Sequence, residues 1–237
     1  MAETSQFQIP ILAAAQAQKH VTVNEALAIL DCVAQLRFLS ATVTTPPLIN
    51  VDGDAYVVPV GATDAWLGKD GKLAVYVNGL WRFLTPKPGW QAFNVETGTN
   101  QLFDGTAWLE STLAATPSGS ATEYQIVEVD HVLAAGATSL TLDVIPAFSQ
   151  VIGVSGRVTS QIVGPLSSWE LGVAGASNRY GSGLGLALNS YVLGLSGSPT
   201  TYYADTPLQL SSVGGDFGGG TVRLAVHYVT IVPPRAI

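Results

Sequence analysis

Tight-turn signals are the feature that most limits what this sequence can fold into. Residues 41–110 contain four Asx-Gly pairs: Asp52-Gly53, Asp70-Gly71, Asn78-Gly79 and Asp104-Gly105. Such pairs favour the left-handed backbone of a hairpin turn, and here they separate short runs rich in β-branched and aromatic residues. In "AVYVNGLWRF" and "QLFDGTAWLE" a tryptophan follows the turn, at Trp81 and Trp108. We therefore expect residues 41–112 to form a small Trp-rich β-module.

The second half of the chain also reads as β structure. Residues 113–123, "LAATPSGSATE", are small, polar and turn-forming, and we expect them to be a linker. Alternating segments such as "SQVIGVSGRVTS" and "GTVRLAVHYVTIV" follow, separated by Gly- and Pro-containing turns. This spacing predicts a β-sandwich over residues 124–237, jelly-roll-like, and a mainly β fold overall.

Residues 1–40 carry the helical pattern of the chain. In "TVNEALAILDCVAQLRFLS", Thr22 is the expected N-cap and Glu25 completes a capping box. The preceding "IPILAAAQAQKH" could form a second short helix. Two interpretations remain open, a helical hairpin or a segment that attaches the chain to a partner or to other copies. The polar residues that would make such contacts are Gln16, Gln18, Lys19, His20, Asn24 and Glu25.

Composition limits the classes of partner. Charged residues make up 11% of the chain and the net charge is −7, whereas a nucleic-acid-binding protein normally presents a basic face. We therefore expect no nucleic acid and no anionic membrane as partner. No apolar run reaches transmembrane length, and no basic region marks a signal peptide. Cys32 is the one cysteine, which excludes a disulfide within the chain and suggests a buried thiol.

No catalytic, metal or cofactor constellation is evident, so we expect no enzyme activity. The histidines His20, His131 and His227 are far apart in the sequence. A glycosidase needs two carboxylates, and Glu170 with Asp205 is the one pair that lies near aromatic residues. The glycine run "GSGLGLALNS" lacks the helix and the acidic residue of a dinucleotide site. We expect its glycines to form a loop or to let strands approach closely.

Two parts of the sequence resemble a known family. "AAAQAQKHVTVNEALAILD" and the Trp-bearing turns that run to "GTAW" resemble the DUF2793 family, over roughly residues 8–110. That family occurs in tailed phages, prophages and gene transfer agents, mainly of alphaproteobacteria. The stretch from Trp169 to Pro234 looks like the second domain often attached to it.

The resemblance implies a virion appendage protein on the particle surface, a head spike or tail fibre that contacts host polysaccharide. Its members would be assembled in the host cytoplasm and contact other virion proteins. We expect a homo-oligomer, a trimer in the first instance and a five-fold assembly as the alternative. The alternative functions are a polysaccharide depolymerase and a purely structural adaptor.

The aromatic residues of the C-terminal half suggest where a glycan would bind. Aromatic faces stack on the apolar faces of sugars, and arginine donates hydrogen bonds to their hydroxyls. The candidates are Trp169, Arg179, Tyr180, Tyr191, Tyr202 and Tyr203. The competing interpretation is that these aromatic residues fill the core or a subunit interface. In a strand, Tyr202 and Tyr203 would face opposite sides.

Overall fold

The computed structural model describes residues 19–236, with side chains from residue 23 onward. Two compact units divide between Gly119 and Ser120, and strands predominate in both, so the predicted mainly β class is confirmed. The C-terminal unit has no helix within its described residues. Nowhere in residues 19–236 is there a helix whose length and hydropathy would suffice to cross a membrane.

The N-terminal unit contains two small sheets. One joins β2 (Ala55–Val57), β3 (Leu73–Val77) and β4 (Leu80–Leu84), all antiparallel. The other has the order β1 (Arg37–Phe38), β5 (Gln91–Asn94), β6 (Thr99–Phe103) and β7 (Trp108–Glu110). A short 3-10 helix spans Asp64–Trp66. The last strand before Gly119 is β8 (Thr112–Ala115), which belongs to neither of these two sheets.

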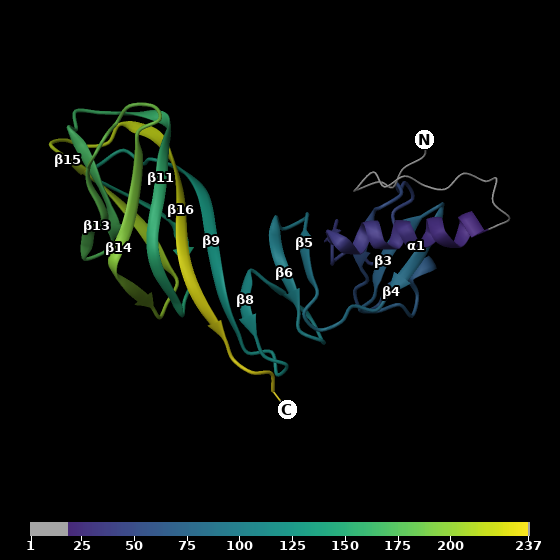
Figure 1. Cartoon of the computed structure of the whole chain (residues 1–237). Helices are drawn as coiled ribbons and strands as arrows, with labels where there is room; N and C mark the ends of the chain where they lie inside the picture. Colours follow the sequence, from purple (N-terminus) through teal and green to yellow (C-terminus); the bar gives the residue numbers. More distant parts are fainter. Residues whose placement is uncertain (1–18, 237) are drawn as a thin grey trace. The chain divides into compact units, whose positions relative to one another are not determined.

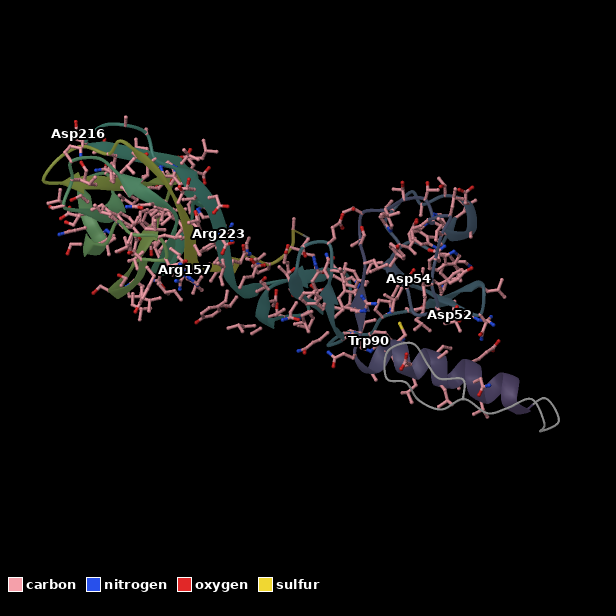
Figure 2. All side chains as sticks on the ribbon, turned by 90° about the horizontal axis from the view of Figure 1, so that it is seen from above. Asp52, Asp54, Trp90, Arg157, Asp216 and Arg223 are labelled. Atoms are coloured by element: carbon pink, nitrogen blue, oxygen red, sulfur yellow. The ribbon has the colours of Figure 1, made fainter. Side chains whose placement is uncertain are left out.

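The predicted hairpin at Asn78-Gly79 is confirmed. Asn78 and Gly79 join β3 to β4 with φ angles of 51° and 78°, the paired positive values of a type I′ turn. The Asn78 backbone N–H also donates to Asp52 Oδ1 at 2.9 Å; Figure 2 labels this aspartate. The hairpin at Asp104-Gly105 is confirmed as well, because Phe103 pairs with Trp108 across it.

Helix α1 (Lys19–Ala34) packs on the N-terminal unit (Figure 1). It begins before Thr22, so the predicted N-cap is wrong. Lys19, His20 and Val21 are all tolerated in a helix, and nothing local halts it at Thr22. Cys32 and Leu36 pack with Phe38 and residues of β2 and β3. The helix is thus part of the β-module's core.

A second cluster of this unit is aromatic. Trp66 is fully buried, with its ring centroid 5.1 Å from that of Trp81 and 5.3 Å from that of Tyr56. Trp90 and Trp108 are half-buried and pack against the cluster that contains Cys32, Leu36 and Phe38. These tryptophans therefore supply core volume to a small unit, because each indole ring buries a large apolar surface.

Cys32 is expected to be almost unreactive while the protein is folded. Burial, with a smaller contribution from the Asp31 carboxylate, raises the pKa of the thiol from 9.0 to about 11. At pH 8 the thiolate fraction is then about 100-fold lower than for an ordinary thiol. Iodoacetamide labelling followed by mass spectrometry should show slow modification of the native chain and rapid modification in urea. Fast labelling of the native chain would contradict the burial.

The C-terminal unit is a jelly-roll sandwich of eight strands: β9 (Ala121–Val132), β10 (Thr138–Ile145), β11 (Ser149–Val163), β12 (Ser168–Val173), β13 (Ala176–Leu184), β14 (Tyr191–Tyr202), β15 (Thr206–Val213) and β16 (Gly219–Val232). The first pairs with the last, the second with the seventh, the third with the sixth and the fourth with the fifth, each antiparallel. Within this unit, the nested pairing places β14, β11, β16 and β9 in that order in one sheet (Figure 1). The other sheet runs β10-β15-β12-β13. It is the pattern of a jelly roll.

The inward-pointing side chains of the strands fill the space between the two sheets. Val154, Val158, Leu224 and Val226 point inward from β11 and β16 and are at most 1% exposed. Ser155, Arg157 and Ala225, which alternate with these inward positions, face outward, since successive side chains of a strand lie on opposite faces. The predicted linker is shorter than its expected bounds, because β8 ends at Ala115 and β9 begins at Ala121.

Candidate functional site

Two of the predicted sugar-stacking residues lie in the sandwich core. Trp169 is 2% exposed and Tyr180 is 3% exposed. The Trp169 Nε1–H donates to the Gly185 carbonyl at 3.0 Å, and the hydroxyls of Tyr180 and Tyr202 lie 2.8 Å apart. Neither ring face is open, so the assignment of both residues to a glycan site is corrected. The sandwich needs bulky side chains to fill the gap between its sheets.

The other predicted residues are spread over the unit. Arg179, on β13, is exposed and donates from Nη1 to Thr200 Oγ1 at 2.9 Å. Tyr203 is 75% exposed, just beyond the end of β14. Tyr191 begins that strand and half-buried Tyr202 ends it. Their partners on β11, Arg157 and Ser149, are eight residues apart, which corresponds to about 26 Å at about 3.3 Å per residue. The six predicted residues therefore do not form one site.

The predicted attachment residues lie on α1 or before it. Gln16 and Gln18 are outside the described residues, and the side chains of Lys19 and His20 are not among those described. Asn24 is half-buried. Glu25 accepts a hydrogen bond from Arg82 Nη2 of β4 at 2.6 Å, so its carboxylate is used to hold the helix on its own unit. Both side chains are nearly 40% exposed, and the pair contributes at most about 1 kcal/mol.

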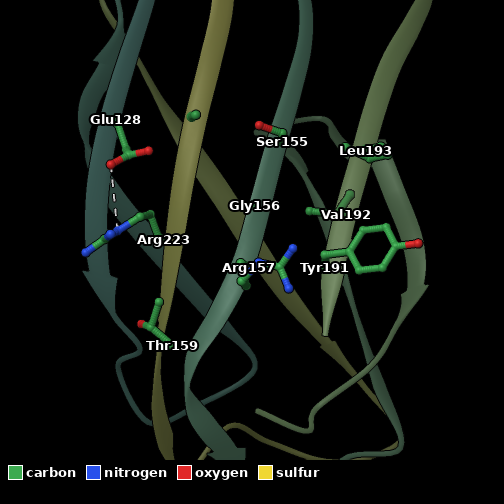
Figure 3. A pocket seen from close by; sticks show the side chains of 10 residues that line it. Glu128, Ser155, Gly156, Arg157, Thr159, Tyr191, Val192, Leu193 and Arg223 are labelled. Carbon is green, nitrogen blue, oxygen red and sulfur yellow. Dashed lines mark ion pairs between the residues drawn. The ribbon is translucent and has the colours of Figure 1, made fainter. Parts of the chain in front are cut away.

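Tyr191 belongs to a different group, on the outer face of the sheet that contains β11 and β16. The registers place Tyr191, Arg157, Arg223 and Asp130 in one row across β14, β11, β16 and β9. The next row holds Leu193, Ser155, Ala225 and Glu128. Figure 3 shows the residues of these rows other than Asp130 from close by, and Figure 2 labels Arg157 and Arg223 on the same unit.

Apart from Asp130, the residues of these two rows line an open groove with a volume of about 380 Å³. Thr159 adds a hydroxyl at one end, and Tyr191 is 64% exposed at the β14 side. We call it the outer groove. It lies on long, hydrogen-bonded strands, and a site built on strands is held more precisely than a site on loops.

Arg223 is tied to carboxylates of β9. Its Nε donates to Asp130 Oδ1 at 2.8 Å and its Nη2 to Asp130 Oδ2 at 2.7 Å, a bidentate pair. Glu128 Oε1 lies 3.7 Å from the same Nε, shown by the dashed line in Figure 3. The hydrogen bonds from Arg223 lower the pKa of Asp130. Asp130 and Arg223 are half exposed, so solvent screens the pair.

Arg157 has a different environment. Its Nη1 donates to the Asn189 carbonyl at 3.0 Å, and its Cζ lies 5.7 Å from the centroid of the Tyr191 ring. Figure 3 shows the guanidinium turned toward that ring. Within residues 23–236 it forms no ion pair with a carboxylate. A cation over an aromatic face is favourable and keeps the guanidinium in a defined orientation.

A second, more apolar pocket of about 340 Å³ continues from the outer groove. Leu193 and Leu195 line it and are 73% and 84% exposed. His227 also lies here, with Nε2 2.9 Å from Ser155 Oγ.

The glycosidase pair considered from the sequence is engaged locally. Glu170 Oε2 accepts a hydrogen bond from Ser177 Oγ at 2.7 Å, and Asp205 Oδ1 accepts one from the Ala147 backbone N–H at 2.8 Å. Among residues 19–236, no three His, Cys, Asp or Glu side chains gather closely enough to hold a metal ion.

Comparison with solved structures gives low-scoring similarities. A chain of the cyanophage Pam1 capsid asymmetric unit is 19% identical, with a TM-score of 0.34, over 46% of this chain and 86% of that one. A chain of the acid-stable capsid of Helicobacter pylori bacteriophage KHP30 is 13% identical, with a TM-score of 0.32, over 48% of this chain and 98% of that one. No curated protein sequence matches the chain. At the level of families, the predicted resemblance is confirmed for one region: residues 23–109 match the family described as "Protein of unknown function (DUF2793)".

Proposed function

We propose that this chain is a structural component of a phage-type particle and that its C-terminal sandwich binds carbohydrate on a host surface. The outer groove is the observation that carries the binding part of the proposal. The particle part rests on the resemblance of the N-terminal unit to DUF2793, which residues 23–109 match. The similarities to two capsid chains, with TM-scores of 0.34 and 0.32, add no weight to it.

The chemistry of the outer groove suits a sugar. A pyranose has apolar C–H faces and a rim of hydroxyls, so it needs a flat apolar surface flanked by donors and acceptors. Tyr191 offers an exposed ring, Arg157 offers N–H donors, and Ser155 and Thr159 offer hydroxyls. Glu128 is an acceptor on the opposite side. An open groove on a sheet also admits a polymer that runs past both ends.

The ion pair of Asp130 with Arg223 favours binding over cleavage. A glycosidase needs one carboxyl group that stays protonated near neutral pH, hence a raised pKa. Beside the outer groove, the bidentate contact with Arg223 instead lowers the pKa of Asp130. We therefore propose a non-enzymatic receptor-binding role, with the N-terminal unit contacting other virion proteins and the chain acting as a homo-oligomer.

Replacing Tyr191 by alanine is expected to lower affinity for host-cell polysaccharide about two- to tenfold, since an aromatic face contact contributes about 0.5–1.5 kcal/mol. Biolayer interferometry with the full chain and purified polysaccharide measures this directly. Tyr203→Ala is the matched control, because this tyrosine is similarly exposed but lies beyond the other end of β14.

Equal binding by the Tyr191 and Tyr203 variants would overturn the assignment of the outer groove. A polysaccharide shortened during the assay would indicate a depolymerase. A folded chain that binds no host polysaccharide would leave a structural adaptor as the better account.

A further inference from the structure

We infer that the outer groove selects a carboxylated sugar, such as a uronic acid, and that Arg157 is the residue that holds its carboxylate. This inference rests on the proposed function, namely that the groove binds carbohydrate. It names the class of sugar and the specificity-determining residue. It is carried by the contrast between the two arginines that lie side by side in one row of the sheet, Arg157 and Arg223.

The two arginines differ in whether their donors are already used. Arg223 gives a bidentate pair to Asp130 and has Glu128 nearby, so its charge is balanced within the protein. Arg157 gives one hydrogen bond, to the Asn189 carbonyl, which is uncharged. A guanidinium has five N–H donors in a planar fork that matches a carboxylate. Arg157 therefore presents unused, charge-assisted donors at an exposed position of the groove.

Tyr191 fixes where a ligand would lie relative to that donor set. The 5.7 Å contact between Arg157 Cζ and the ring centroid keeps the guanidinium beside the aromatic face. A carboxylate bound to the open edge of Arg157 then brings its sugar ring next to Tyr191, where the apolar face of the sugar can pack. One sugar unit would thus use both residues at once, the carboxylate for specificity and the ring for area.

The far side of the groove limits how many carboxylates it can accept. Glu128 and Asp130 lie on β9, two strands from Arg157, which corresponds to about 10 Å at the spacing of neighbouring strands. Carboxylates there repel a second acidic group but accept hydrogen bonds from hydroxyls. The arrangement fits a chain in which an acidic sugar at Arg157 is followed by a hydroxyl-rich neutral sugar.

Non-specific attraction does not explain such a preference. The chain has a net charge of −7, so its overall field opposes the approach of a polyanion. Any preference for an acidic glycan must come from a local contact, and it should disappear when that contact is removed.

The test uses the full chain on an array in which each acidic glycan is printed beside its carboxyl-reduced form. Uronate polymers and sialylated glycans are the acidic members. We expect wild-type protein to bind one or more acidic members about tenfold more tightly than the reduced forms, the size of one charge-assisted pair. Arg157→Gln should remove that preference, so that this variant binds the acidic and the reduced forms with equal affinity, while Arg157→Lys should keep part of the preference.

Arg179→Gln is the matched control, because Arg179 is an exposed arginine of β13 that also donates to a single neutral oxygen, Thr200 Oγ1. It should bind like wild type. Equal binding of acidic and reduced forms by wild type would overturn the inference while leaving the proposed function intact. A preference that survives in Arg157→Gln would overturn the role of Arg157. Binding to no glycan would overturn the inference and the proposed function together.

Discussion

Replacing Trp169 by alanine is expected to lower the free energy of unfolding of the C-terminal unit by about 3–5 kcal/mol, the usual cost of removing a large buried aromatic side chain. Trp169 is 2% exposed and packs in the main cluster of the sandwich with Leu171, Tyr180 and Leu210. The change also removes the donor to the Gly185 carbonyl. Urea denaturation followed by far-ultraviolet circular dichroism measures the effect.

The Tyr203→Ala variant serves as the control, because Tyr203 is 75% exposed and its loss should cost less than about 1 kcal/mol. A Trp169 variant as stable as this control would contradict the packing. The prediction also has a practical consequence. Loss of glycan binding in Trp169→Ala would report unfolding, so this residue should not be used to map a binding surface.

Gly194→Ala is expected to destabilise the same unit by about 1–3 kcal/mol or more, since overpacking forces the backbone to move. A Cβ at Gly194 would lie 2.1 Å from the carbonyl oxygen of Tyr180. Gly194 faces inward on β14, opposite Val154, at a point where β13 of the other sheet comes close. Only a residue without a side chain permits this approach.

Gly197 provides a control on the same strand. A Cβ there meets no atom within 4 Å, and its φ is not in the left-handed region. Gly197→Ala should therefore be neutral or stabilise the unit by up to about 1 kcal/mol, through the lower entropy of the unfolded chain. Thermal denaturation of the two variants in parallel is the measurement. A Gly194 variant as stable as the Gly197 variant would contradict the close approach of β13 to Gly194.

The parts of the fold that depend on local chemistry could be predicted from the sequence. Asn78-Gly79 specifies its turn through two residues that tolerate positive φ, and the hairpin follows. The alternation in β11 and β16 likewise predicts strands with one buried face. The start of α1 was missed, because a good N-cap residue at Thr22 does not by itself end the helix on its N-terminal side.

The candidate site could not be predicted in the same way. Tyr191, Arg157, Arg223 and Asp130 become neighbours only through the registers of four strands, and no local pattern specifies a register between distant segments. For Trp169, the sequence indicates a strand but does not say which face is buried. Arg157 and Glu128 each stand among alternating apolar residues, and this pattern marks them as polar residues on the outer face of a strand. That they lie in one groove follows only from the position of β11 and β9 on either side of β16.

The nested strand pairing has a consequence for the order of folding. The innermost pair, β12 with β13, joins segments close in sequence, whereas Arg223 and Asp130 are 93 residues apart. Closing a long loop costs chain entropy before the new contacts compensate for it. Strand pairing should therefore proceed outward from β12 and β13 and end with β9 and β16. During synthesis the outer groove would thus be absent until the last strand has left the ribosome. A chain cut short before β16 would present an unpaired β9 edge, the kind of surface that drives aggregation.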